Sequence, residues 1–237
     1  MAEETGTSDR TSLRNAISNA MARIKREFYG KGPSRTRTFI YDRIVISVLD
    51  DVLTPVELTL KEGGRSGLVR RLRLTFEDIM ADAFTGQVER LTGARVLAYH
   101  SQIVFDPDMA IEVFVLDRPA QRGGTHGAGA GSAIADAMVR IVHEHWGKGP
   151  TRAKAYVEDG FVFCVMEEPL TTVERTLVES GETDLVRHLR IEFQELVNHE
   201  SAERVATLTG RRVLTSHGQI VFDPDILFQI FVLDEPG

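Results

Sequence analysis

The sequence has little cysteine, no excess of positive charge and no long apolar run, and each shortage excludes a class of protein. Cys164 is the single cysteine among 237 residues, so the chain can form neither an internal disulfide framework nor a multi-cysteine metal site. No apolar run approaches the roughly 20 residues that a membrane-spanning helix needs. The acidic start is unlike a secretory signal. We therefore expect a cytoplasmic protein without direct membrane insertion.

The charge balance argues against nucleic-acid binding. Acidic residues outnumber basic ones by 35 to 28, which gives a formal net charge of -7. Non-specific binding to nucleic acid depends on neutralising phosphates with Lys and Arg, and the chain contains no basic block. Hydrophobic residues make up 42% and charged residues 27% of the chain. These values are typical of globular proteins, so we expect a folded chain and no nucleic-acid partner.

An internal repeat organises the chain. The stretch Gly30-Lys31-Gly32-Pro33 recurs 117 residues later as Gly147-Lys148-Gly149-Pro150, and 102–108 recurs at the same offset as 219–225. A unit of this size exceeds the 20–50 residues of a solenoid repeat and can hold its own core. We predict a disordered N-terminus at 1–11, a first unit at 12–119, a Gly-rich linker at 120–131 and a second unit at 132–237.

Each unit has the same predicted element order. Helical spacing begins at Leu13 and stops at Gly30, and two short β runs follow at 35–41 and 43–49. Thr54, Pro55 and Glu57 form the signature of a capped helix start. A longer helix is expected over 66–92, followed by β runs at 95–105 and 109–116. The unit reads α-β-β-α-α-β-β, an α+β fold with a four-stranded antiparallel sheet packed with helices.

Apolar patterns suggest how the elements pack. The second and fourth strands are apolar on both faces, which predicts central strands covered on both sides. Helices can cover one face, so we expect the other face to pair with the second unit as a pseudo-twofold pair within the chain. Two separate domains on a linker are the alternative. The predicted buried stripe of the long helix is Val69, Leu72, Phe76, Ile79, Met80, Ala83 and Leu91.

The ordered motifs resemble those of the MpsC-like family. They are Gly-Lys-Gly-Pro after the first helix, Leu-Thr-x-x-Glu, Val-Arg-x-x-Arg on the long helix, Thr-Gly-x-x-Val and Asp-Pro-Asp. The resemblance covers both units and implies a tandem copy of a domain that most members carry once. It also implies association with a bacterial sodium-translocating or inorganic-carbon uptake system. It carries no catalytic residues over to this sequence.

Four arginines are the first candidate site. Arg70 and Arg73 in the first unit, and Arg187 and Arg190 in the second, lie three residues apart on the long helix. Paired guanidiniums match the geometry of carboxylate, phosphate or bicarbonate, so these residues could bind a small anion. The alternative is an internal salt bridge to Glu57 and Glu174 that holds the short helix on the long one.

Two lysines and two histidines complete the candidates. Lys31 and Lys148 follow a helix C-terminus, where a lysine complements the helix dipole, although anion binding is the other interpretation. His100 and His217 are the only histidines matched between the units and could act as an acid/base or as a pH sensor. A hydrogen-bonded structural role is the alternative. No spacing indicates a cofactor, a metal site or a catalytic residue.

We therefore expect a non-catalytic accessory or regulatory protein that binds a protein partner, such as a membrane transporter subunit, or a small anion such as bicarbonate. One alternative is a small enzyme acting on an anionic metabolite at the interface of the units. The other is a purely structural dimerisation module, either as the intramolecular pair or as a homo-oligomer.

Overall fold

The computed structural model describes residues 2–120, 130–158 and 160–235, with side chains from residue 11 onward. The chain divides into two compact units, Met1–Gly124 and Thr125–Gly237, which are described separately. The expected linker lies mostly outside the described residues, and helix α4 already begins at Ala130. Helix α1 extends back to Ala2, well before the apolar pattern that starts at Leu13. The disordered N-terminus and the unit boundaries stay predictions.

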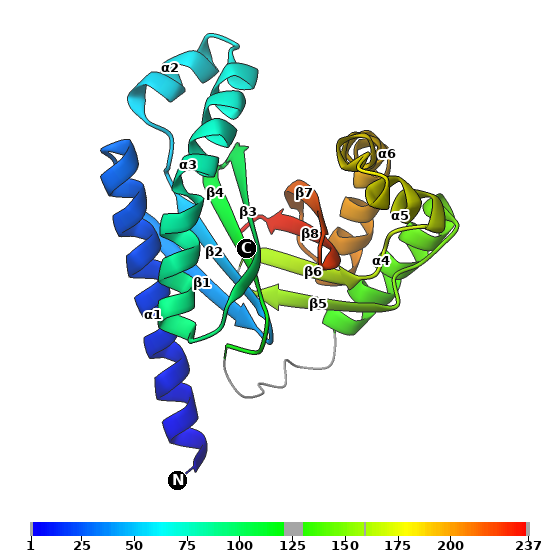
Figure 1. Cartoon of the computed structure of the whole chain (residues 1–237), viewed down its shortest axis with the longest axis horizontal. Helices are drawn as coiled ribbons and strands as arrows, with labels where there is room; N and C mark the ends of the chain where they lie inside the picture. The colour runs from blue at the N-terminus through cyan, green and yellow to red at the C-terminus, as the bar shows by residue number, and fades with distance from the viewer. Residues whose placement is uncertain (1, 121–129, 159, 236–237) are drawn as a thin grey trace. The chain divides into compact units, whose positions relative to one another are not determined.

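Both units have the predicted element order (Figure 1). Unit 1 contains α1 (Ala2–Tyr29), β1 (Arg35–Tyr41), β2 (Ile44–Asp50), α2 (Pro55–Glu62), α3 (Ser66–Thr92), β3 (Val96–Phe105) and β4 (Asp108–Leu116). Unit 2 contains α4 (Ala130–Trp146), β5 (Arg152–Glu158), β6 (Phe161–Glu167), α5 (Thr172–Glu179), α6 (Thr183–Thr209), β7 (Val213–Phe222) and β8 (Asp225–Leu233). The α+β fold prediction is confirmed.

Each unit contains one antiparallel sheet of four strands. The strand order is β1-β2-β4-β3 in unit 1 and β5-β6-β8-β7 in unit 2. The second and fourth strands of each unit are therefore central, as their apolar character on both faces predicts. In unit 1, β1 and β2 are joined by a two-residue turn at Asp42-Arg43, where Asp42 has a φ of 54°. In unit 2, Gly160 has a φ of 82°, and Asp159 lies outside the described residues.

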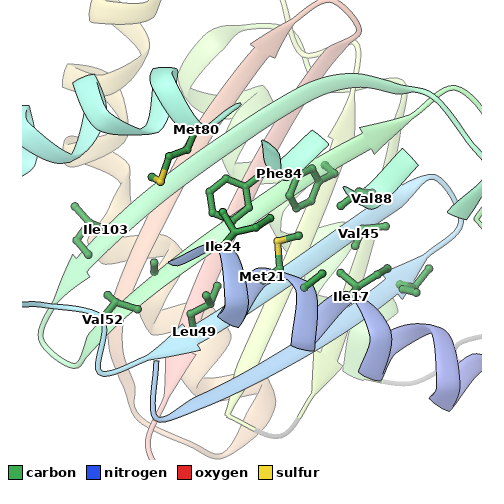
Figure 2. Packing of buried hydrophobic residues seen from close by; sticks show 14 of the residues in the cluster. Ile17, Met21, Ile24, Val45, Leu49, Val52, Met80, Phe84, Val88 and Ile103 are labelled. Atoms are coloured by element: carbon green, nitrogen blue, oxygen red, sulfur yellow. The ribbon is translucent and has the colours of Figure 1, made fainter. Parts of the chain in front are cut away.

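The core of unit 1 lies between one face of its sheet and helices α1 and α3 (Figures 1 and 2). Figure 2 shows Met21 and Ile24 of α1 beside Phe84 of α3, with Val45 of β2 in the same cluster. Because successive strand residues alternate between faces, Ile46, Val48 and their neighbours on β4 point to the opposite face, which is also apolar.

The predicted stripe of the long helix is partly wrong. Leu72 and Ile79 are exposed, at 50% and 64%, although both were expected to be buried. The buried residues of α3 are Val69, Arg73, Glu77, Met80, Phe84 and Val88. Two charged residues thus occupy the inward side. The position of Arg73 beside the stripe is consistent with its burial, whereas a stripe defined by apolar residues alone leaves out Glu77 and includes the exposed Leu72 and Ile79.

Gly86 inside α3 and Gly93 at its C-terminal cap should respond oppositely to substitution by alanine. Gly93 ends the helix with a φ of 67°, where a Cβ is strained, so Gly93→Ala should lower the free energy of unfolding by about 1 kcal/mol. Gly86 is an exposed helical residue with open space around it, so Gly86→Ala should raise that free energy by about 0.5–1 kcal/mol. Urea titrations of both variants test this, and two changes of the same sign would contradict it.

Candidate functional site

A buried salt bridge joins the two helices that follow the first hairpin. Arg73 on α3 donates from Nε to Glu57 Oε1 at 2.5 Å and from Nη2 to Glu57 Oε2 at 2.6 Å. The same Nη2 donates to the carbonyl oxygen of Val52 at 2.7 Å. The guanidinium lies 4.1 Å from the ring centre of Tyr29 on α1. Only 1% of the Arg73 side chain is exposed, so this bidentate pair holds α2 on α3 away from water.

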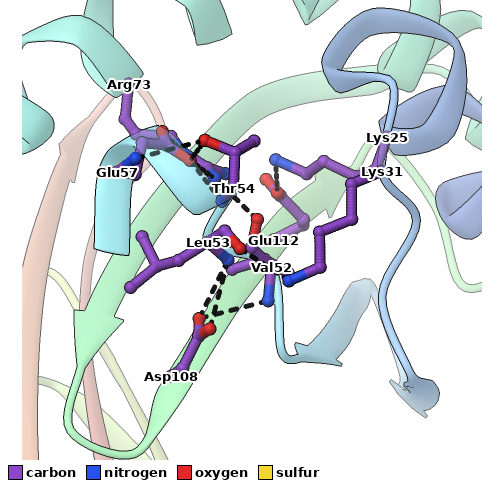
Figure 3. Close-up of polar contacts among 9 residues, drawn as sticks. All are labelled: Lys25, Lys31, Val52, Leu53, Thr54, Glu57, Arg73, Asp108 and Glu112. Atoms are coloured by element: carbon purple, nitrogen blue, oxygen red, sulfur yellow. Dashed lines mark hydrogen bonds and ion pairs between the residues drawn. The ribbon is translucent and has the colours of Figure 1, made fainter. Parts of the chain in front are cut away.

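Glu57 also caps its own helix. Its carboxylate accepts from the backbone N–H of Thr54 at 2.7 Å, and its backbone N–H donates to Thr54 Oγ1 at 3.4 Å, which completes the predicted capping box (Figure 3). Burial alone would raise the pKa of Glu57, but the hydrogen bonds from Arg73 and Thr54 outweigh it and lower the pKa. This interaction therefore stabilises the fold above the ordinary pKa of glutamate and is lost as the pH falls through the lowered value.

Unit 2 repeats the arrangement. Arg190 donates to Glu174 at 2.5 and 2.7 Å and to the carbonyl oxygen of Pro169 at 2.9 Å. Its guanidinium lies 4.8 Å from the ring centre of Trp146. Glu174 and Thr171 form the second capping box. Arg73 and Arg190 therefore form the internal salt bridges that the sequence offered as one of two interpretations.

Arg70 and Arg187 make contacts different from those of Arg73 and Arg190. Arg70 lies over the ring of Phe105 at 5.3 Å, and Arg187 lies over Phe222 at 5.0 Å. Arg70 is exposed and Arg187 is half-buried, whereas Arg73 and Arg190 are buried. Within each unit the two guanidiniums thus contact different rings, and anion binding by these four residues stays a prediction.

Lys31 and Lys148 bind backbone carbonyls in front of the short helices. Lys31 Nζ donates to the carbonyl oxygen of Leu53 at 2.5 Å, and Lys148 Nζ donates to that of Leu170 at 2.5 Å. In unit 1, Asp108 at the start of β4 accepts from the backbone N–H groups of Val52 and Leu53, each at 3.1 Å (Figure 3). These contacts secure the segment that leads into α2, and anion binding by the lysines is untested.

The histidines lie apart from the arginines within each unit. His100 pairs with Val113 across the sheet, while its neighbour Tyr99 stacks on Phe114 in the core. Since neighbouring strand residues face opposite sides, His100 points away from α1 and α3, and α3 is the helix that carries Arg73. His217 holds the same place in unit 2, and its Nε2 lies 3.1 Å from Thr215 Oγ1. Acid/base or pH-sensing roles for these histidines remain hypotheses.

Sequence reasoning missed a polar row in the core of unit 1. Thr38, Ser47, Glu112 and Ser101 pair in register across all four strands, on the face that α1 and α3 cover. All four are buried. The signal was an acid, Glu112, in the middle of an otherwise apolar strand.

The row is extended by charged residues from the helices. Lys25 of α1 forms a 2.8 Å ion pair with Glu112 Oε1, as Figure 3 shows. Tyr99 donates to Glu112 Oε2 at 2.7 Å. Glu77 of α3 is a further buried carboxylate on this side.

Unit 2 replaces the charges with neutral groups. The positions of Lys25, Glu77 and Glu112 are occupied by Val142, Gln194 and Gln229. The rest of the polar row becomes Ala155, Cys164 and Gly218. A Cβ at position 218 would overlap the Gln194 amide, so Gly218 makes room for that glutamine. A small cavity in unit 2 is lined by Val142, Arg190, Gln194, Ser201 and others, where unit 1 has the larger Lys25 and Phe84.

Two observations concern the potential metal ligands and the single thiol of the described ranges. Across 2–120, 130–158 and 160–235, no three His, Cys, Asp or Glu side chains gather as metal ligands would. Cys164 is fully buried, and burial raises the pKa of its thiol to about 12, which keeps it protonated and unreactive. Over the same ranges, no helix is both long and apolar enough to span a bilayer.

Comparison with known proteins agrees with the duplicated architecture. The family model described as "Na+-translocating membrane potential-generating system (MpsC)" matches residues 9–118 and again residues 130–235. The chain belongs to the MpsC family. Its match to "Uncharacterized protein YrhF" of Bacillus subtilis (strain 168) is 25% identical over 104 residues, which is 43% of this chain and 85% of YrhF. No solved structure matches.

The match to YrhF has the length of one unit. The MpsC fold is thus present twice here, and each copy keeps the salt bridge between the long and short helices. The family name connects the chain to a membrane system.

The two arginines of α3 should differ in their contribution to stability. Arg73→Met leaves Glu57 buried without its partner and should lower the free energy of unfolding by about 3–5 kcal/mol. Arg70→Met removes an exposed contact with Phe105 and should cost less than about 1 kcal/mol. Chemical denaturation followed by circular dichroism measures both, and equal effects would contradict the structural role of Arg73.

Proposed function

We propose that the chain is a non-catalytic accessory or regulatory protein of a membrane ion or inorganic-carbon translocating system, and that it acts by binding a protein partner. The observation that carries this proposal is a set of exposed apolar side chains that both units present at matching positions. Unit 1 exposes Val56, Leu68, Leu72, Leu74 and Ile79, and unit 2 exposes Val173, Leu185, Leu189, Ile191 and Leu196.

Three members of each set form a line along the long helix, which we call the outer ridge. It consists of Leu68, Leu72 and Ile79 on α3 and of Leu185, Leu189 and Leu196 on α6. Spacings of four and seven residues place them on one side of the helix. They are between 46% and 76% exposed. Exposed apolar side chains in a row mark a protein interaction site, and this spacing suits a helix or an apolar groove of the partner.

A binding role also fits better than an enzyme acting through the arginines and histidines. An active site of that kind needs both groups in one pocket. Within unit 1 the sheet separates His100 from Arg73, and the cavity of unit 2 is lined by Arg190 without a histidine. A bound anion such as bicarbonate, an enzymatic site at the interface of the units and a cytoplasmic location remain separate hypotheses.

We also propose that the two units form the pseudo-twofold pair, because each sheet has an apolar face that its own helices do not cover. The face turned away from the helices carries Ile46, Val48 and Val113 in unit 1. Unit 2 carries Phe163, Val165 and Ile230 at these positions. An apolar sheet face of this kind is stable when another apolar surface covers it.

Charges placed on the outer ridge should release the partner. A tagged chain is used to capture membrane complexes solubilised in mild detergent from its own host, and the subunits retained are quantified. Leu72→Asp with Leu189→Asp should reduce the retained translocating subunits at least about tenfold, because a buried unpaired charge opposes docking. Gly67→Asp is the matched control, since it adds a charge that unit 2 already carries at Asp184. Equal retention by all three proteins would contradict the ridge as the docking surface.

Removal of the second unit should expose the sheet face of the first. We expect a chain of residues 1–119 to form dimers, because a second copy can cover the face that unit 2 would otherwise occupy. Light scattering after size exclusion measures the mass. Val48→Asp, in the middle of that face, should shift this fragment to monomers. A soluble monomer without the substitution would count against the pair.

A further inference from the structure

We propose that the interior of unit 1 is a proton-binding site, built from Glu77, Glu112 and Lys25, and that unit 2 carries a permanently neutral version of it. The proposal does not depend on the partner binding above. It rests on the charges and contacts enclosed between α1, α3 and the sheet.

Lys25 and Glu112 form an ion pair inside this interior. Lys25 and Glu112 are 1% and 0% exposed, and their charged atoms are 2.8 Å apart. The lysine also lies 5.1 Å from the ring centre of Phe84. Burial, followed by the charge of Glu112, raises the pKa of Tyr99 well above its usual value, so its hydroxyl stays a donor to Glu112. One positive and one negative charge therefore cancel here.

Among the buried charges that the structure describes in this interior, Glu77 is the one without an oppositely charged partner. Arg73 from α3 is matched by Glu57 from α2. Tyr29 of α1 also lies in this interior, and burial raises its pKa, so it contributes no charge near neutral pH. Glu77 is 6% exposed, and within the described part of the chain the cations nearest to it, Lys25 and Arg73, are already paired with Glu112 and Glu57. Its ionisation would add an uncompensated negative charge to a dry core, which is strongly unfavourable.

The environment of Glu77 places its titration near neutral pH. Burial and, next, the negative charge of Glu112 raise its pKa to about 7, although Lys25, Ser101 and Arg73 act in the opposite direction. In the folded chain the carboxyl thus takes up a proton as the pH falls through 7. An unfolded glutamate does so about 2–3 pH units lower.

The matching positions of unit 2 show the neutral form of the same interior. Gln194 has the shape of a protonated Glu77 and carries no proton to lose. Gln229 replaces Glu112 and Val142 replaces Lys25, so the whole charge set is absent. Because glutamine has the size and shape of a protonated glutamate, Glu77→Gln should fold.

The consequence is a pH dependence of stability whose sign is set by the raised pKa. Between the unfolded and folded values, the folded chain binds one proton more than the unfolded chain. The equilibrium constant for unfolding should therefore rise by up to about tenfold per pH unit from pH 5 to 7 and become level above it. Glu57 and Glu174 titrate below this window, because their pKa values are lowered.

Urea titrations of the full-length chain between pH 5 and 8 test the site. Glu77→Gln should remove the rise in the unfolding constant over this range. Asp78→Asn, at an exposed neighbouring position, is the matched control and should keep it. The same rise in wild type and Glu77→Gln, or its loss in Asp78→Asn alone, would overturn the proposal.

A direct titration covers the case in which the variant does not fold. The side-chain carboxyl carbon of Glu77, observed by NMR in the wild-type chain, should titrate with a midpoint near 7. A midpoint below about 5 would overturn the proton-binding site, whatever the variants do.

Discussion

The buried pair of Arg73 and Glu57, with its copy Arg190 and Glu174, is the interaction on which the position of each short helix depends. The bidentate contact fixes α2 and α5 on the long helices, and the same carboxylates cap the short helices at their N-termini. A carboxylate that satisfies a cap and a guanidinium at once leaves little freedom for the segment between them. Loss of either partner would leave a charge in the core, so the pair acts as a constraint more than as a source of extra stability.

This constraint is the same in both units, although the residues of their interiors differ. The salt bridge, the caps and the exposed apolar residues recur in both units, but the interior beneath α1 and α4 differs. Lys25, Glu77 and Glu112 give way to Val142, Gln194 and Gln229 together. Replacing Lys25 or Glu112 alone would leave its partner's charge unpaired, whereas replacing both of them removes the pair without that cost. The two interiors are thus alternative neutral solutions within one framework.

Local patterns predicted the architecture well because its elements follow local rules. Thr54-Pro55-x-Glu57 specifies a capped helix, and strands apolar on both faces specify central positions, both of which the structure confirms. The orientation of α3 was mispredicted because Arg73 and Glu77 are buried and Leu72 is exposed. A stripe drawn from apolar residues alone cannot include a buried acid such as Glu77, because charged residues are mostly exposed.

The candidate site was harder to predict for the same reason. Arg73 could be paired with Glu57 from sequence, but the polar row needs the strand register, which brings Thr38, Ser47 and Ser101 beside Glu112. Those residues lie on all four strands, and no local spacing connects them. The groups that interact with Glu77 come from different elements: Lys25 from α1, Arg73 from α3, and Ser101 and Glu112 from the sheet. A change in the charge of Glu77 would therefore affect α1, α3 and the sheet together. Since α3 also carries the outer ridge, the proposed proton-binding site and the proposed docking surface lie on opposite sides of one helix.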